Sequence, residues 1–170
     1  NLYKMLGEHD SALGIFKEVS IRNPDNASSK FESGELLKFK GKFDEAEQCY
    51  KQAIAADDHC YEAYLERSKI KKQTPSSNHT QPIEKFLETG VRSNQGAAKL
   101  FYALAKEYED MDEYKRTFIN IKRGADIQSQ LTKYDVRNDI KIVEKIKSVY
   151  SEVTATSQTR ACQSNEPIFI

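Results

Sequence analysis

Two stretches of this chain share one pattern at a spacing of 34 positions. The sequence GEHDSALGIFKEVSIRNPDN begins at Gly7, and GKFDEAEQCYKQAIAADDHC begins at Gly41, so that Ala12 corresponds to Ala46. In each stretch a glycine precedes an acidic residue, a small alanine and an aromatic residue. A period of this length is typical of paired helices that bury their apolar faces only by stacking on the next pair. The period therefore predicts an all-α protein made of consecutive helical hairpins.

Small and large residues alternate within the second stretch as such packing requires. Gly34, Ala46 and Ala53 stand where two helices are expected to cross closely. Larger residues are expected to fill the remaining space, and these are Leu37, Phe43 and Tyr50. We expect Gly41 to end a helix, since glycine tolerates the left-handed backbone of a tight helix terminus.

The third hairpin departs from this pattern. A helix is predicted over residues 61–73, but Arg67 and Lys71 occupy positions that are apolar elsewhere in the repeat. A polar loop at 74–81, longer than the period allows, then precedes a short second helix. The pattern resumes over 95–131, with Thr117 in the place of Ala46. We therefore expect one irregular hairpin between two regular ones.

A further helix is predicted after residue 134. Asp135 can cap its start, and an apolar stripe follows at the spacing of one helix face, formed by Ile140, Val143, Ile146 and Tyr150. Because the end of a helical stack needs a soluble cover, we expect this helix to cap it.

Through its glycine, alanine and aromatic positions the sequence resembles the tetratricopeptide-repeat (TPR) family. The resemblance implies a right-handed α-solenoid over residues 1–152. Within it we expect a truncated first hairpin (1–23), a repeat (24–58), an irregular repeat (59–94), a repeat (95–131) and a C-terminal capping helix (135–152). It also implies a protein-protein interaction module.

The order of several landmarks extends the resemblance. KKQTPSSN is followed by LFYALAKEYEDMDEYKRTFINIKRG, then by KYD and a helix, and finally by EPIFI. This order resembles the N-terminal region of bacterial proteins that join TPR repeats to a sulfotransferase domain. It implies that 153–170 is a linker and the first strand of a missing C-terminal domain, which alone would bind the donor PAPS. We therefore expect no catalytic residue and no cofactor in this chain, which would not itself be an enzyme. The alternative is a stand-alone TPR scaffold or a co-chaperone-like adaptor.

The register also predicts a concave face that binds a protein or peptide. The first helices of the hairpins would line it with aromatic anchors and with lysines for acidic ligand groups, namely Phe31, Glu35, Lys38, Phe39, Leu65, Lys69, Lys72, Tyr102, Lys106 and Glu109. An ordinary solvated helix face remains the alternative interpretation.

Charge and composition limit the other classes of function. Lys and Arg number 26 and Asp and Glu number 26, so no net charge draws the chain to nucleic acid or to an anionic membrane. No apolar run approaches the roughly 20 residues that span a bilayer. Three cysteines without CxxC spacing predict a reducing, cytoplasmic setting. His59 and Cys60 lack further ligands for a metal, so no metal site is predicted. A homodimer through an exposed end of the stack stays open.

Overall fold

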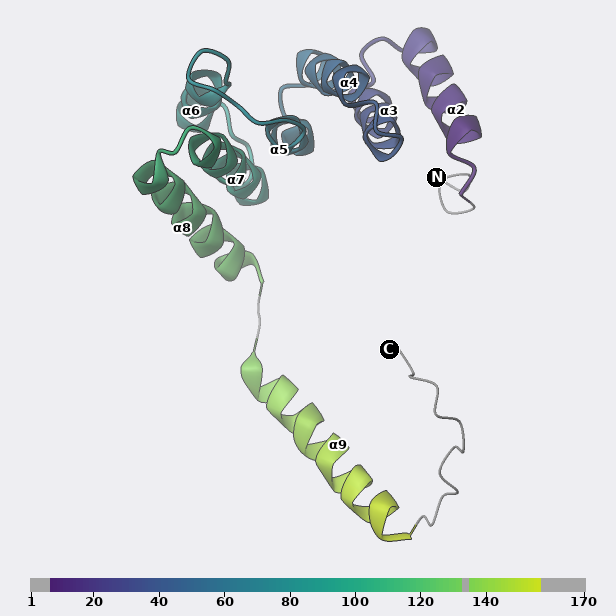
Figure 1. The fold of residues 1–170 in the computed structure, drawn as a ribbon, viewed down its shortest axis with the longest axis vertical. Helices are drawn as coiled ribbons and strands as arrows, with labels where there is room; N and C mark the ends of the chain where they lie inside the picture. Colours follow the sequence, from purple (N-terminus) through teal and green to yellow (C-terminus); the bar gives the residue numbers. More distant parts are fainter. Residues whose placement is uncertain (1–6, 133–134, 157–170) are drawn as a thin grey trace. The chain divides into compact units, whose positions relative to one another are not determined.

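The computed structural model describes residues 7–132 and 135–156, with side chains described as far as Tyr150 (Figure 1). The chain divides into two units, the first ending at Thr132 and the second beginning at Lys133. In the first unit the helices are α2 (His9–Arg22), α3 (Ala27–Phe39), α4 (Phe43–Ala56), α5 (Tyr61–Lys69), α6 (Thr80–Thr89), α7 (Asn94–Asp110) and α8 (Tyr114–Leu131). The second unit contains α9 (Val136–Thr156). The described residues form no β-strand, only an isolated bridge between Thr74 and Ser77, so the all-α prediction is confirmed for them.

The α3–α4 hairpin begins and ends where its sequence predicts. The Asn26 side chain accepts a hydrogen bond from the backbone N–H of Ser29 at 2.8 Å and so caps α3. Gly41 closes the same helix with φ of 73°, the left-handed conformation predicted for it. The Lys42 N–H then reaches the Leu37 carbonyl at 2.9 Å, which satisfies a group that the helix end leaves free.

Close packing of α3 on α4 explains the small residues in this hairpin. A Cβ added to Gly34 would lie 2.6 Å from the Tyr50 ring, so only glycine allows this approach. Ala46, Tyr50 and Ala53 are fully buried at 0% exposure. Phe43 was predicted to fill a gap in the same way, and that prediction is wrong: it stands at the first position of α4, where the residue is 52% exposed.

The third hairpin is irregular, as predicted, although its first helix is shorter than expected. α5 ends at Lys69 rather than at Gln73. The cause is a change of hydrogen-bond partner, because the backbone N–H of Gln73 donates to the Asp110 carboxylate of α7 at 3.0 Å instead of continuing the helix. The chain then turns through the 74–77 bridge before α6 begins at Thr80.

Helices α5, α6 and α8 all pack on α7. Around α7 a core cluster forms from Tyr61, Tyr64, Ile83, Leu100, Ala103, Leu104 and Tyr108, and a second cluster joins α3, α4 and the start of α5. Thr117 and Gly124 of α8 are buried, like Ala46 and Ala53, to which the repeat makes them equivalent. The positions that the repeat spacing makes equivalent in α4 and α8 are thus buried in both helices.

The second unit is described by itself. Its helix α9 starts beside Asp135, whose carboxylate accepts a hydrogen bond from the Arg137 N–H at 3.0 Å, as the predicted cap requires. The predicted apolar stripe lies within α9, while its role as a cap stays a prediction. From residue 157 onward, the predicted linker and strand lie outside the described residues. Among the described helices, none has the length and apolar character needed to span a bilayer.

Candidate functional site

The residues predicted to form a peptide-binding face belong to three helices and one loop of the first unit. Helix α3 contributes four of them, α5 two and α7 three, and Lys72 is exposed just beyond α5. The face therefore draws on the first helices of successive hairpins. That this face binds a peptide stays a prediction.

The aromatic members of this face take part in helix packing. The Phe31 ring lies 5.9 Å from the Tyr50 ring, centroid to centroid. The Tyr102 ring lies against α8, where a Cβ added to Gly124 would come within 3.0 Å of it. Phe39 alone of the three is largely exposed, at 70%. Phe39 is consequently the aromatic residue of this face that is most available to a ligand.

Three charged members, Glu35, Lys38 and Lys69, belong to an ion-pair network that joins α3 to α5. Lys38 Nζ lies 2.7 Å from Glu35 Oε1 and 2.6 Å from Glu66 Oε2. The Tyr50 hydroxyl donates to Glu35 at 2.6 Å, and Lys69 pairs with Glu66 at 3.1 Å. Burial alone would lower the pKa of Lys38, but its hydrogen bonds to the two carboxylates outweigh burial and raise that pKa above its ordinary value. An acidic ligand would have to displace carboxylates that already neutralise these lysines.

A buried carboxylate on α7 holds the irregular loop of the third hairpin. Glu107 is 0% exposed and accepts hydrogen bonds from the Ser68 hydroxyl at 2.6 Å and from the His79 backbone N–H at 2.5 Å. The His79 ring Nδ1 lies 3.1 Å from the same carboxylate. Burial raises the pKa of Glu107, yet these hydrogen bonds outweigh burial, so that the pKa lies below its ordinary value. The sequence analysis missed this residue, because an acidic residue in a helix carries no local sign of a partner in a distant loop.

The serine, histidine and glutamate of this cluster are not arranged for nucleophilic catalysis. In a catalytic triad the serine hydroxyl donates to the histidine, which in turn donates to the carboxylate. Here the Ser68 hydroxyl donates directly to Glu107 Oε1, the atom that the His79 ring also faces. The His79 ring is therefore not positioned to take a proton from Ser68, and the cluster connects α5, the loop and α6 to α7.

The two basic residues at apolar positions of α5 and its loop have different environments. Arg67 is 8% exposed, with its guanidinium 5.7 Å from the Tyr64 ring centroid, and its Nε has no hydrogen-bond partner among the described residues. Burial lowers the pKa of Arg67, although the nearby Glu107 opposes the shift. Lys71 is exposed and its ammonium group pairs with the buried Glu47 of α4. Both residues are thus held by acidic or aromatic neighbours within the stack.

Potential metal ligands gather in the turn between α4 and α5. Within the described part of the chain, the grouping consists of Asp57, Asp58 and His59. His59 Nε2 lies 3.0 Å from the Gly90 carbonyl, which can only accept, so this nitrogen carries a proton and Nδ1 faces the two carboxylates. Exposed acidic groups beside a histidine are common without a metal, and the Cys60 thiol is not part of the group. No metal role follows from it.

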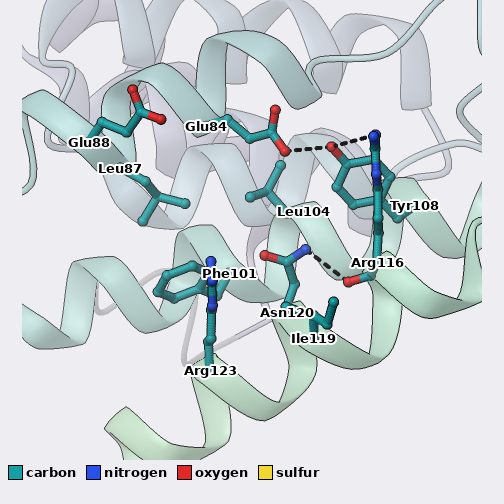
Figure 2. Close-up of a pocket in the computed structure, with 10 residues that line it drawn as sticks. All are labelled: Glu84, Leu87, Glu88, Phe101, Leu104, Tyr108, Arg116, Ile119, Asn120 and Arg123. Carbon is teal, nitrogen blue, oxygen red and sulfur yellow. Dashed lines mark hydrogen bonds between the residues drawn. The ribbon is translucent and has the colours of Figure 1, made fainter.

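An open groove of about 490 Å³ lies between α6 and α8, with α7 beneath it (Figure 2). Ten residues line it: Glu84, Leu87 and Glu88 from α6, Phe101, Leu104 and Tyr108 from α7, and Arg116, Ile119, Asn120 and Arg123 from α8. None of them belongs to the face predicted from the sequence. At its floor Leu104 and Tyr108 are each only 2% exposed, whereas one wall carries two carboxylates and the other carries two guanidinium groups.

Polar contacts fix the walls of this groove. The Tyr108 hydroxyl donates to Glu84 at 2.6 Å and lies 3.5 Å from Arg116 Nη1. Each arginine also lies over an aromatic ring of α7, Arg116 at 5.2 Å from the Tyr108 centroid and Arg123 at 5.7 Å from the Phe101 centroid. Cation–π contacts of this kind orient a guanidinium group without neutralising its charge. Arg116 also forms an ion pair with Glu113 at 3.3 Å. The two walls of the groove therefore hold ordered side chains of opposite charge.

No family model matches the sequence, and the search of curated proteins finds no match either.

Proposed function

We propose that this chain is a protein-interaction module that binds a segment of a partner protein through the groove between α6 and α8. The proposal rests on one observation, an open groove whose two walls carry side chains of opposite charge. Binding sites typically pair apolar contact with a small number of placed polar groups. The groove volume is also within the range of such sites.

The finer architecture that we propose is a right-handed solenoid of TPR hairpins, closed at its C-terminal end by residues 135–152. Support comes from positions that the repeat makes equivalent. Ala46 and Thr117 are both buried, and so are Ala53 and Gly124. Solenoids of this kind use their surfaces to hold other proteins, which agrees with a binding role.

The parent protein that we propose is a cytoplasmic sulfotransferase whose catalytic domain would follow Ile170, so that PAPS would bind there and not to this chain. The order of sequence landmarks supports this assignment. A stand-alone scaffold or co-chaperone-like adaptor is the alternative. Reading the gene beyond Ile170 distinguishes the two: a stretch like Gly-x-Pro-Arg-Ser-Gly-Thr supports the sulfotransferase, and its absence removes it.

A peptide array probed with the full chain tests the binding function and locates the surface. One variant reverses the charge of the groove wall, Arg116→Glu with Arg123→Glu. A second reverses the lysines of the predicted face, Lys38→Glu, Lys69→Glu and Lys106→Glu. We expect the first variant to lose the bound peptides and the second to keep them, with circular dichroism confirming that both are folded. The opposite result would move the site to the predicted face, and an array without any binding peptide would refute the proposed function.

A further inference from the structure

We propose that α9 joins two copies of this chain by packing antiparallel on α9 of a second copy, with Val143 at the centre of the contact. This proposal goes beyond the binding function proposed for the groove, and it involves no residue of the groove. It follows from the order of apolar and charged residues along one side of α9, which is complementary to the same order in reverse.

The apolar surface of α9 is wider than one neighbouring helix covers. Seven of its apolar residues are between 47% and 66% exposed, namely Val136, Ile140, Ile142, Val143, Ile146, Val149 and Tyr150. At 100° per residue they occupy an arc of about 180° around the helix, whereas the seam between two paired helices needs only a narrower stripe. A role of α9 as a cap would therefore still leave apolar surface for a second copy.

The apolar residues on one side of α9 are placed symmetrically about Val143. Ile140 and Ile146 lie three positions before and after it. Val136 and Tyr150 lie seven positions before and after it. At 100° per residue, all four lie within about 60° of the side of the helix that carries Val143. An antiparallel pair centred on Val143 thus brings each of these residues level with an apolar residue of the other copy, as a two-fold contact requires.

The charges on this side of α9 favour the antiparallel direction. Asp139 and Lys147 lie four positions before and after Val143, and both lie about 40° from it around the helix. In an antiparallel pair each Asp139 is level with Lys147 of the other copy, so opposite charges meet twice. In a parallel pair each charge would be level with its own equivalent, and like charges repel.

Two further lysines are symmetric about the same centre but lie on the far side of the helix. Lys141 and Lys145 are two positions before and after Val143, which places both about 160° away from it around the helix. They consequently point away from a second copy packed at Val143. Their positive charges do not oppose the antiparallel contact.

The size of the contact predicts a dimer that dissociates on dilution. From Val136 to Tyr150 the stripe is about 21 Å long at 1.5 Å per residue, and a single helix pair of this length buries less area than permanent dimers do. We expect the full chain to pass from monomer to dimer between roughly 1 μM and 1 mM. Sedimentation equilibrium at low salt measures this change, with a reducing agent present to prevent disulfides between copies.

Reversing one charge at a time should remove the match between the two copies. Lys147→Glu leaves acidic side chains at both positions and Asp139→Lys leaves basic ones, so each variant should dimerise about tenfold more weakly. The double variant with both changes restores opposite charges and should dimerise like the native chain. An equimolar mixture of the two single variants should form a heterodimer.

Lys145→Glu is the matched control. It makes the same change in charge two residues from Lys147, but on the side of α9 that faces away from the proposed contact. It should therefore leave the strength of the dimer unchanged. Circular dichroism checks that every variant keeps the helix content of the native chain.

Each outcome bears on the proposal. A native chain that stays monomeric over the whole concentration range would overturn it. A dimer that is unaffected by Lys147→Glu and Asp139→Lys, or that Lys145→Glu weakens equally, would place the contact elsewhere and overturn it as well. Weakening by both single variants, with recovery in the double variant and in the mixture, supports the antiparallel contact. None of these results decides whether the groove binds a peptide, which the array tests separately.

Discussion

Replacing Glu107 by glutamine is expected to destabilise the fold by about 2–3 kcal/mol. The carboxylate accepts hydrogen bonds from Ser68 and His79 in a site with no solvent exposure. A glutamine of the same shape keeps one oxygen for the His79 N–H and places an NH2 group beside the Ser68 hydroxyl, which can turn to accept. Both hydrogen bonds then survive, but neither involves a charged group. A hydrogen bond to a charged group contributes about 1.5–3 kcal/mol and one between neutral groups about 0.5–1.5 kcal/mol, so the two exchanges together cost about 2–3 kcal/mol.

Urea unfolding followed by circular dichroism at pH 7 measures this loss. Glu109→Gln is the matched control, because it makes the same chemical change on the same helix at an exposed position, and it should alter the free energy of unfolding by less than about 0.5 kcal/mol. A Glu107→Gln protein as stable as the control would refute the role of Glu107 in holding the loop.

The same residue predicts a dependence on pH. The pKa of Glu107 in the folded chain lies below its ordinary value of 4.5, so the unfolded chain binds more protons between these two values. The stability contributed by this carboxylate is complete above the ordinary value and is lost as the pH falls through the folded value. The difference between the native protein and Glu107→Gln should therefore shrink below about pH 4.5. A difference that stays constant down to pH 3 would contradict the lowered pKa.

Three further predictions concern the helix pairs. Gly34→Ala should destabilise the chain by about 1–3 kcal/mol, because the added Cβ meets the Tyr50 ring. Gly14→Ala has open space around the added Cβ and should stabilise the chain by about 0.5–1 kcal/mol. Thermal melting compares the two variants. Ala46→Leu should overpack the α3–α4 core by about 1–3 kcal/mol, and an unchanged melting temperature would count against the register. Burial raises the pKa of the Cys49 and Cys60 thiols, so mass spectrometry should find both alkylated more slowly in the folded chain than in urea.

The repeat predicted those features that depend on close contact between helices adjacent in the chain. Gly34 and Gly41 could be assigned because a close crossing and a left-handed helix end each demand glycine. The irregular third hairpin was also predicted from its polar loop. These features follow from residues near one another in sequence, where side-chain size and backbone freedom decide the structure.

The contacts that define the candidate site could not be predicted in this way. Glu107 reaches His79 in a distant loop, and Lys38 on α3 reaches Glu66 on α5. A period shows which positions are equivalent, but it does not show which polar side chains meet across helices or which positions stay uncovered. Phe43 is an example of a position that stays uncovered: it has the large residue that the repeat predicts, but that residue is exposed.

The groove exists because the third hairpin is irregular. α7 holds α6 through two successive residues: Glu107 binds the backbone just before α6 begins, and the Tyr108 hydroxyl binds Glu84 in its second turn. These polar contacts fix the position of a short helix that the period does not specify. They also orient the acidic wall towards the arginines of α8. Loosening the first contact by Glu107→Gln should consequently weaken peptide binding at the groove as well as stability, although Glu107 does not line the groove. The irregular third hairpin is therefore part of the proposed site, and its departure from the repeat has a role in the proposed function.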